Sequence, residues 1–179
     1  SFSEPWLGGR KPNSFGMSYN YSIQRYIDPF TDRTQGSLSV SGVTVSLGRR
    51  ANWPDDFFVI SNSVSISKYR LFDYPQFSLG FATGDANSIV FNTTVSRRSS
   101  DNPMYPQRGS DLSVSVNLTP PYSLWNDIDY ETAEPQDIYK WVEYHKWNVD
   151  LRYYLPIVPK LVFAPRLHFG FIGSYSDRA

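Results

Sequence analysis

Residues 111–118 read Asp-Leu-Ser-Val-Ser-Val-Asn-Leu, a strict alternation of polar and apolar side chains. The same period of two runs without an error from Ser14 to Ile23, where large apolar residues alternate with Ser, Gly and Asn. Successive side chains of a β-strand point to opposite faces, so this period is typical of a strand and not of a helix. Both stretches therefore predict strands with one apolar and one polar face.

The alternation extends outward from these two stretches over most of the chain. It predicts five more strands, at Ser37–Leu47, Phe58–Lys68, Ser88–Arg97, Tyr144–Leu155 and Leu161–Ile172. In the first of these, Leu38 and Val40 are out of phase with Val43 and the apolar residues that follow it. An extra residue in one strand shifts the phase of the alternation, so we predict a β-bulge near Ser41-Gly42.

The connections between the predicted strands alternate in length. Three are long, at residues 24–36, 69–87 and 119–143, and three are shorter, at residues 48–57, 99–109 and 156–160. An antiparallel meander with long loops at one end and short turns at the other is the connectivity of an outer-membrane barrel, so we expect the long loops to face the cell exterior. The longest connection contains the one predicted helix, about Glu134–Tyr144, which has Pro135 near its first position and carries a short apolar stripe.

The composition excludes several classes of protein. The chain has 179 residues with 17 Lys+Arg and 17 Asp+Glu, and its net charge of zero argues against a nucleic-acid partner. Aromatic residues make up 17% of the chain, yet its mean hydropathy is −0.42. No stretch approaches the roughly 18 consecutive apolar residues of a membrane-spanning helix. A transmembrane β-barrel is compatible with this composition, because its strands need only alternate.

The two faces of the predicted strands favour a membrane barrel over a soluble sandwich. The polar face carries mostly Ser, Gly, Asn and Thr, where a soluble sandwich usually shows Lys and Glu. The apolar face has almost no mid-strand charge, as expected where a lipid-facing Arg or Lys costs about 2–4 kcal/mol at the bilayer midplane. Five ionisable residues share the inferred interior face and predict a water-filled or salt-bridged lumen: Asp111, Asp150, Arg152, Arg166 and His168.

Aromatic residues gather at the predicted strand ends and turns. They are Trp6, Trp53, Phe57, Tyr105, Tyr122, Trp125, Trp141 and Trp147. Rings at the two ends of a membrane-spanning wall form interfacial girdles, which we expect here. The same rings would cap the ends of a sandwich core, so this observation separates the two folds only modestly.

No catalytic or metal-binding motif stands out. The chain has no cysteine, and its two histidines, His145 and His168, are widely separated. The acidic run of Asp127, Asp129 and Glu131 lacks the glycine and the terminal glutamate of a calcium loop and is interpreted as a solvated loop. We therefore expect no enzyme activity, no cofactor and no metal.

At the turns, the sequence resembles a known family. The opening Glu4-Pro5-Trp6-Leu7-Gly8-Gly9-Arg10 is similar to an early periplasmic turn of BamA-type outer-membrane insertases, in the form found in Bacteroidota. Residues 101–110 resemble the family's turn in the middle of the barrel, and residues 140–146 resemble the segment before the next strand. The resemblance covers nearly the whole chain. It gives a structural role in turns to Glu4, Pro5, Trp6, Tyr105, Pro106 and Gly109.

The resemblance implies an all-β fold, an antiparallel up-and-down transmembrane barrel of sixteen strands. Residues 1–179 would be part of this one barrel domain and supply about seven to eight of its strands, from the end of the fourth to about the eleventh. The family's periplasmic POTRA domains, its first and last barrel strands and its sixth outer loop have no counterpart in this sequence. Functional residues of those parts are therefore not carried over.

The resemblance also implies a function, the folding and insertion of β-barrel proteins into the outer membrane of a Gram-negative bacterium. The partners would be nascent outer-membrane β-barrel proteins, accessory lipoproteins or other outer-membrane subunits, and outer-membrane lipid or lipopolysaccharide. The alternatives are a passive porin or transporter barrel, a related secretion or translocation barrel of the same superfamily, and a soluble β-sandwich binding module. An outer-membrane hydrolase comes last, because the chain offers no plausible Ser-His pair.

Overall fold

The computed structural model describes residues 1–9, 13–27, 34–73, 83–125 and 140–175. These residues form nine strands and two short 3-10 helices, η1 (Leu7–Gly9) and η2 (Tyr122–Leu124). The strands are β1 (Phe2–Glu4), β2 (Asn13–Ile27), β3 (Thr34–Arg50), β4 (Phe58–Phe72), β5 (Gly84–Arg98), β6 (Gly109–Leu118), β7 (His145–Val158), β8 (Leu161–Phe163) and β9 (Arg166–Gly173). Within the described residues, no helix has the length and apolar character needed to cross a membrane.

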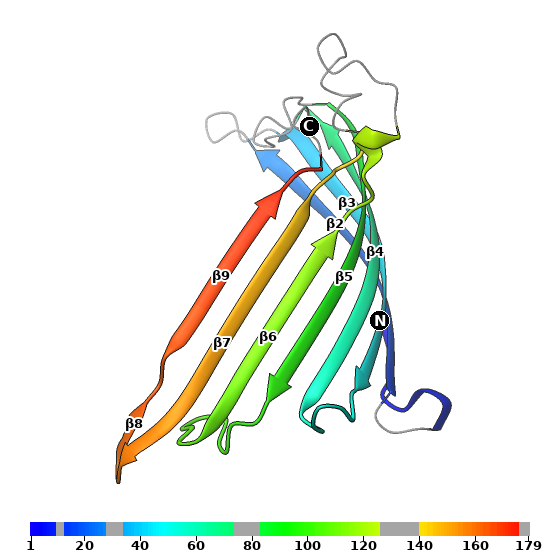
Figure 1. Cartoon of the computed structure of the whole chain (residues 1–179). Helices are drawn as coiled ribbons and strands as arrows, with labels where there is room; N and C mark the ends of the chain where they lie inside the picture. The colour runs from blue at the N-terminus through cyan, green and yellow to red at the C-terminus, as the bar shows by residue number, and fades with distance from the viewer. Residues whose placement is uncertain (10–12, 28–33, 74–82, 126–139, 176–179) are drawn as a thin grey trace.

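All nine strands belong to one antiparallel sheet, and each strand from β1 to β7 pairs with the next along the chain (Figure 1). The order runs from β1 to β8, and β9 continues beside β7 after β8. The strand ends that flank residues 28–33, 74–82 and 126–139 lie at one end of the sheet, which we call the long-loop end. Residues 51–57, 99–108 and 159–160 connect the strands at the other end, the short-turn end. The predicted all-β, up-and-down antiparallel fold is confirmed.

The predicted strands are present, and most extend further than the alternation indicated. The stretch predicted as one strand from Leu161 to Ile172 is divided into β8 and β9 at Ala164-Pro165. Proline has no amide hydrogen for the ladder, and here the Pro165 carbonyl accepts the Tyr153 N–H at 3.1 Å. The predicted helix is wrong where the structure describes it, because residues 140–144 are not helical, and its remainder lies outside the described residues.

The register places polar and apolar residues on opposite faces of the sheet. Directly opposed residues of antiparallel strands point to the same face. Ser63 of β4 lies between Ser46 of β3 and Asn92 of β5, and the next row, which contains Val64, points to the other side. We call the polar side the inner face and the apolar side the outer face.

The bulge predicted near Ser41-Gly42 is wrong. The pairing of β2 with β3 is continuous from Asn13↔Arg49 to Tyr26↔Gly36, and its register shifts only between Tyr26 and Ile27. Leu38 and Val40 therefore lie on the inner face, in phase with the glycine and hydroxyl residues of β3. The apparent slip in the sequence is a change in the polarity of each face along an unbroken strand.

This exchange of polarity recurs in the neighbouring strands at the long-loop end. There the outer face is polar and the inner face is apolar, with Leu38 and Leu71 4–5% exposed and Ala86 fully buried. On the outer face, the Lys68 ammonium forms an ion pair with the Asp85 carboxylate at 2.9 Å. These three apolar residues are the buried apolar side chains of the described residues. The small core of the wall thus lies on the inner side of its long-loop end.

Candidate functional site

The outer face carries a continuous exposed apolar band between the two ends of the sheet. Its exposed side chains include Met17, Tyr19, Tyr21, Ile23, Leu47, Val64, Ile66, Phe91, Trp147, Leu151, Leu167, Phe169 and Phe171. Monomeric soluble proteins rarely expose apolar patches beyond a few hundred Å². A band that crosses every long strand is therefore the surface that acyl chains, and not water, would cover.

Two polar side chains interrupt the band and satisfy each other. Asn62 of β4 lies opposite Thr93 of β5, and the Thr93 hydroxyl donates to the Asn62 amide oxygen at 3.0 Å. A hydroxyl or amide without a partner is costly in an apolar medium, and the cross-strand hydrogen bond reduces that cost. The exception that Asn62 makes in the sequence pattern is thus compensated in the fold.

The aromatic residues predicted to form girdles divide between the ends of the sheet. Trp6, Trp53, Phe57 and Tyr105 lie in the connections of the short-turn end, and Tyr122, Trp125, Trp141 and Trp147 lie at or near the long-loop end. Trp53 is 84% exposed and Trp125 is 70% exposed. Amphipathic rings at both borders of the apolar band match the membrane–water interfaces.

The inner face brings four of the five predicted lumen residues together. Asp150 of β7 accepts from Arg166, from Arg152 at 3.4 Å and from His168 at 3.3 Å. Asp111 points to the same face, opposite Arg152, but its carboxylate accepts the Ser100 hydroxyl at 2.9 Å instead. The arrangement is an exposed ion-pair network on the inner face of the sheet. The described residues contain no cluster of three or more His, Asp or Glu arranged to hold a metal.

The first turn motif is organised by its own side chains. The Glu4 carboxylate accepts the Trp6 N–H at 3.1 Å, and the Gly9 N–H reaches the Trp6 carbonyl at 2.9 Å. Gly9 has a φ of 69°, a conformation that glycine adopts without steric cost. Glu4 therefore holds the chain as it leaves β1, with Pro5 inside the bend.

The second turn motif, between β5 and β6, is closed by Asp101, by Asn102, whose amide oxygen accepts the Met104 N–H at 2.8 Å, and by Gly109. Asp101 accepts the N–H groups of Gln107 and Arg108 at 2.9 and 3.2 Å, which lowers the pKa of its carboxyl. Gly109 has a φ of 107°, and a Cβ there would lie 2.3 Å from the Ser99 carbonyl oxygen. Tyr105 and Pro106 lie on the loop that these contacts hold, and Tyr105 is 79% exposed.

Sequence reasoning missed Arg97, which joins two turns at the short-turn end. Its guanidinium contacts the Asp55 carboxylate twice at 2.8 Å, and it donates to the hydroxyls of Ser99 and Ser110 at 2.7 Å. It also lies 5.7 Å from the centre of the Phe57 ring. Arg97 is the last residue of an alternating outer-face series, and a charge at that position was the available signal.

The base of the connection between β6 and β7 is tied to the sheet at the long-loop end. The Glu143 carboxylate accepts both the N–H and the hydroxyl of Ser123 at 2.7 Å. The Asn87 N–H of β5 donates to the Lys140 carbonyl at 2.7 Å, and the Val142 N–H donates to the Asn87 carbonyl at 2.9 Å. The segment thus pairs with β5 where β6 has ended. The acidic residues Asp127, Asp129 and Glu131 lie outside the described residues.

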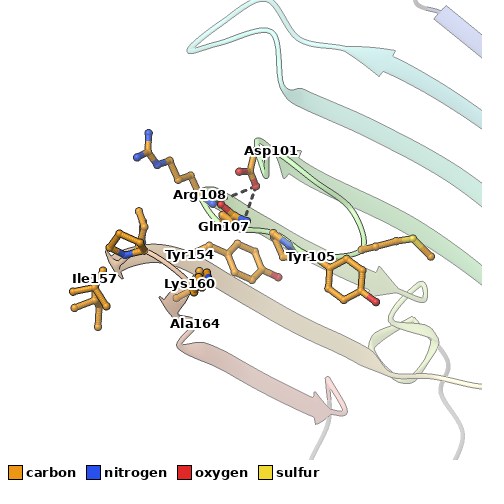
Figure 2. A pocket seen from close by; sticks show the side chains of 14 residues that line it. Asp101, Tyr105, Gln107, Arg108, Tyr154, Ile157, Lys160 and Ala164 are labelled. Carbon is orange, nitrogen blue, oxygen red and sulfur yellow. Dashed lines mark hydrogen bonds between the residues drawn. The ribbon is translucent and has the colours of Figure 1, made fainter.

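The short-turn end also contains a cleft of about 930 Å³ between the β5–β6 turn and the β7–β8 hairpin (Figure 2). Tyr105 and Arg108 line one side, and Ile157 and Lys160 line the other. Tyr154, an inner-face residue of β7, contributes its ring to the cleft.

Comparison with known proteins agrees with this geometry. The family model described as the Omp85 superfamily domain matches residues 1–178. No curated protein matches the chain.

Proposed function

The chain belongs to the Omp85 superfamily, a family of outer-membrane β-barrels for protein insertion and translocation, and we propose that it is part of a BamA-type insertase barrel. In this proposal the full protein folds nascent β-barrel proteins and inserts them into the outer membrane. The residues described above form the central wall of that barrel, away from the seam where client strands would enter.

The observation that carries the proposal is the family match over residues 1–178 on a wall with a lipid-type outer face. The match narrows the function to insertion or translocation. The BamA-type assignment rests on the resemblance of the two turns, in which Glu4, Asp101 and Gly109 have defined structural contacts. It is this turn resemblance that favours insertion over translocation.

The proposed mechanism uses backbone pairing and no bound cofactor. A client strand would pair with the exposed edge of a weakly closed seam, as in β-augmentation, so that its backbone groups are satisfied before it enters lipid. The wall contributes by holding its shape: its long strands pair in register, and ties such as Arg97–Asp55 and Glu143–Ser123 fix the turns and loops at both ends. A rigid wall confines opening to the seam.

The proposed partners follow from this role. They are unfolded β-barrel clients, accessory lipoproteins or other outer-membrane subunits of an assembly complex, and the lipid or lipopolysaccharide of the outer membrane. Nucleic acid is not among them, because the chain has a net charge of zero.

The test is reconstitution of the full-length protein that contains this chain into liposomes. Urea-denatured β-barrel client is added, and its folding is followed by the shift in electrophoretic mobility of unheated samples. The proposal predicts faster client folding than in empty liposomes of the same composition. Unchanged client folding together with steady ion conductance would instead indicate a passive pore. Export of a passenger protein across the bilayer without client folding would indicate a translocation barrel.

A further inference from the structure

The cleft at the short-turn end is formed by a gap in the wall. β6 begins at Gly109, opposite Tyr154, whereas β7 continues to Val158 and pairs there with β8. Among the described residues, the last four residues of β7 therefore have a strand neighbour only on the β8 side. The β5–β6 turn and the β7–β8 hairpin face each other across this gap (Figure 2).

The hairpin is apolar on both of its faces, unlike the strands above it. Leu155, Leu161 and Phe163 continue the outer-face band, and all three are about half exposed. The inner side carries the opposed pair Pro156 and Val162, where the rest of the wall is polar, and Val158 and Ala164 also line the cleft. Met104, 82% exposed, faces the same cleft from the turn. The cleft is thus an apolar groove that begins at the lower border of the lipid-facing band.

The rim of the groove carries two cations without a compensating acid. Arg108 and Lys160 are exposed, and neither forms an ion pair within the described residues. Asp101 is the acidic residue of the lining, and its carboxylate already accepts two backbone N–H groups of its own turn. An occupant with an anionic group and an apolar body would complement this rim and this lining.

The backbone argues against a peptide as that occupant. A peptide that added a strand to the free side of β7 would need the N–H groups of that edge. Pro156 provides none, and Pro159 and Lys160 follow at the hairpin tip. Proline and lysine on an edge are common protections against strand addition. A lipid needs no backbone hydrogen bonds, and it reaches the groove directly from the adjacent leaflet.

We propose that the groove between the β5–β6 turn and the β7–β8 hairpin binds one anionic phospholipid of the leaflet at the short-turn end. Arg108 and Lys160 bind the phosphate headgroup, and Met104, Val158 and Val162 contact the acyl chains. The bound lipid covers the apolar inner side of the hairpin and fills the gap where β6 is missing. The inference rests on the membrane placement of the wall in the proposed function.

The test measures lipid binding to the full-length protein in neutral detergent, with dioleoyl phosphatidylglycerol and dioleoyl phosphatidylcholine as probes. The double variant R108Q/K160Q should bind phosphatidylglycerol about tenfold or more weakly. Each Lys or Arg near a headgroup strengthens the binding of an anionic lipid by about fivefold, and the variant loses two of them. The control R49Q/R50Q removes the same charge from the short-turn end outside the groove and should keep wild-type binding. Equal losses in both variants, or equal binding of the two lipids, would overturn the site.

A second measurement identifies the occupant without changing its charge contacts. A photo-crosslinking residue at Val162 should give a phosphatidylglycerol adduct, whereas the same residue at Val59, on the inner face but outside the groove, should give none. A protein adduct at Val162 would overturn the lipid assignment in favour of a polypeptide partner. If the wild-type protein inserts clients but binds phosphatidylglycerol and phosphatidylcholine equally, this lipid site alone is rejected. Recovery of the wild-type protein without detergent would reject the membrane placement itself.

Discussion

Gly109 illustrates how one backbone position determines the shape of a turn. Its φ of 107° directs the chain into β6, and the space for a Cβ is taken by the Ser99 carbonyl. The turn resemblance in the sequence marked this glycine, because glycine is the residue that such conformations require. The acceptors that close the loop, Asp101 and Asn102, could not be assigned from sequence, since their hydrogen bonds depend on the folded path of residues 103–108.

The variant Gly109→Ala should destabilise the protein by about 1–3 kcal/mol, the usual cost of backbone strain at one residue. The measurement is the urea dependence of unfolding of the purified full-length protein in lipid vesicles. The control is Gly170→Ala in β9, where the added Cβ meets only the Asn148 amide oxygen at 3.4 Å. Equal stability of the two variants would show that the turn does not need this conformation.

The contact between Arg97 and Asp55 should be measurable as a coupling energy. A double-mutant cycle with Arg97→Ala and Asp55→Ala is expected to give about 1 kcal/mol, because the pair is charge-assisted and the side chains are only 24% and 34% exposed. The comparison cycle uses Lys68 and Asp85, which are 42% and 48% exposed and should couple by less than about 0.5 kcal/mol. The reverse ranking would contradict the role assigned to Arg97.

The Asp101 turn should weaken in acid. Backbone N–H groups lower the pKa of Asp101 in the folded state. The stabilisation of the turn by the ionised Asp101 is therefore complete above the unfolded-state pKa of about 3.9, and it is lost as the pH falls through the folded-state pKa. Hydrogen-exchange protection of the Gln107 and Arg108 amides should therefore fall only below about pH 4. In Asp101→Asn the protection should be lower and independent of pH. A pH response retained in that variant would assign the effect to another group.

At the scale of the strand, β3 shows what a periodic pattern conceals. Its alternation predicts two phases joined by a bulge, yet the strand pairs with β2 and β4 without interruption there. Hydrophobic periodicity identifies which face of a strand is apolar. It cannot distinguish a bulge from an unbroken strand whose apolar residues move from the outer to the inner face along its length. Ser39 and Ser41 lie on the outer face above the apolar band, and Leu38 is buried inside.

The strand β6 provides the most direct mutational test of the face assignment. Val114→Arg or Val116→Arg should reduce the amount of assembled protein, because an arginine on the lipid side costs about 2–4 kcal/mol at the bilayer midplane. Ser115→Arg, between them on the inner face, should assemble close to the wild-type level. The readout is the heat-modifiable band in isolated outer membranes. Equal tolerance at the three positions would reverse the assignment of the two faces.

The antiparallel meander could be predicted from the sequence, because the strand period and the connection lengths are visible without knowledge of the contacts. The sequence was also sufficient to place Asp150, Arg152, Arg166 and His168 on one face. It could not predict that three of them converge on Asp150, since this depends on the register between β7 and β9. The sequence could not predict the groove for the same reason. The groove forms because β6 begins at Gly109, opposite Tyr154, while β7 continues past that point.

The membrane placement of the wall depends on which solvent meets each of its faces. The test places spin labels one at a time along residues 111–118 of the full-length protein in lipid vesicles. It measures how strongly each label is relaxed by oxygen, which dissolves in the membrane, and by a nickel chelate, which stays in water. Labels at 112, 114, 116 and 118 should be relaxed mainly by oxygen, and labels at 111, 113, 115 and 117 mainly by the nickel chelate. Nickel accessibility at all eight positions, or the opposite alternation, would contradict a wall whose Val and Leu side chains contact lipid.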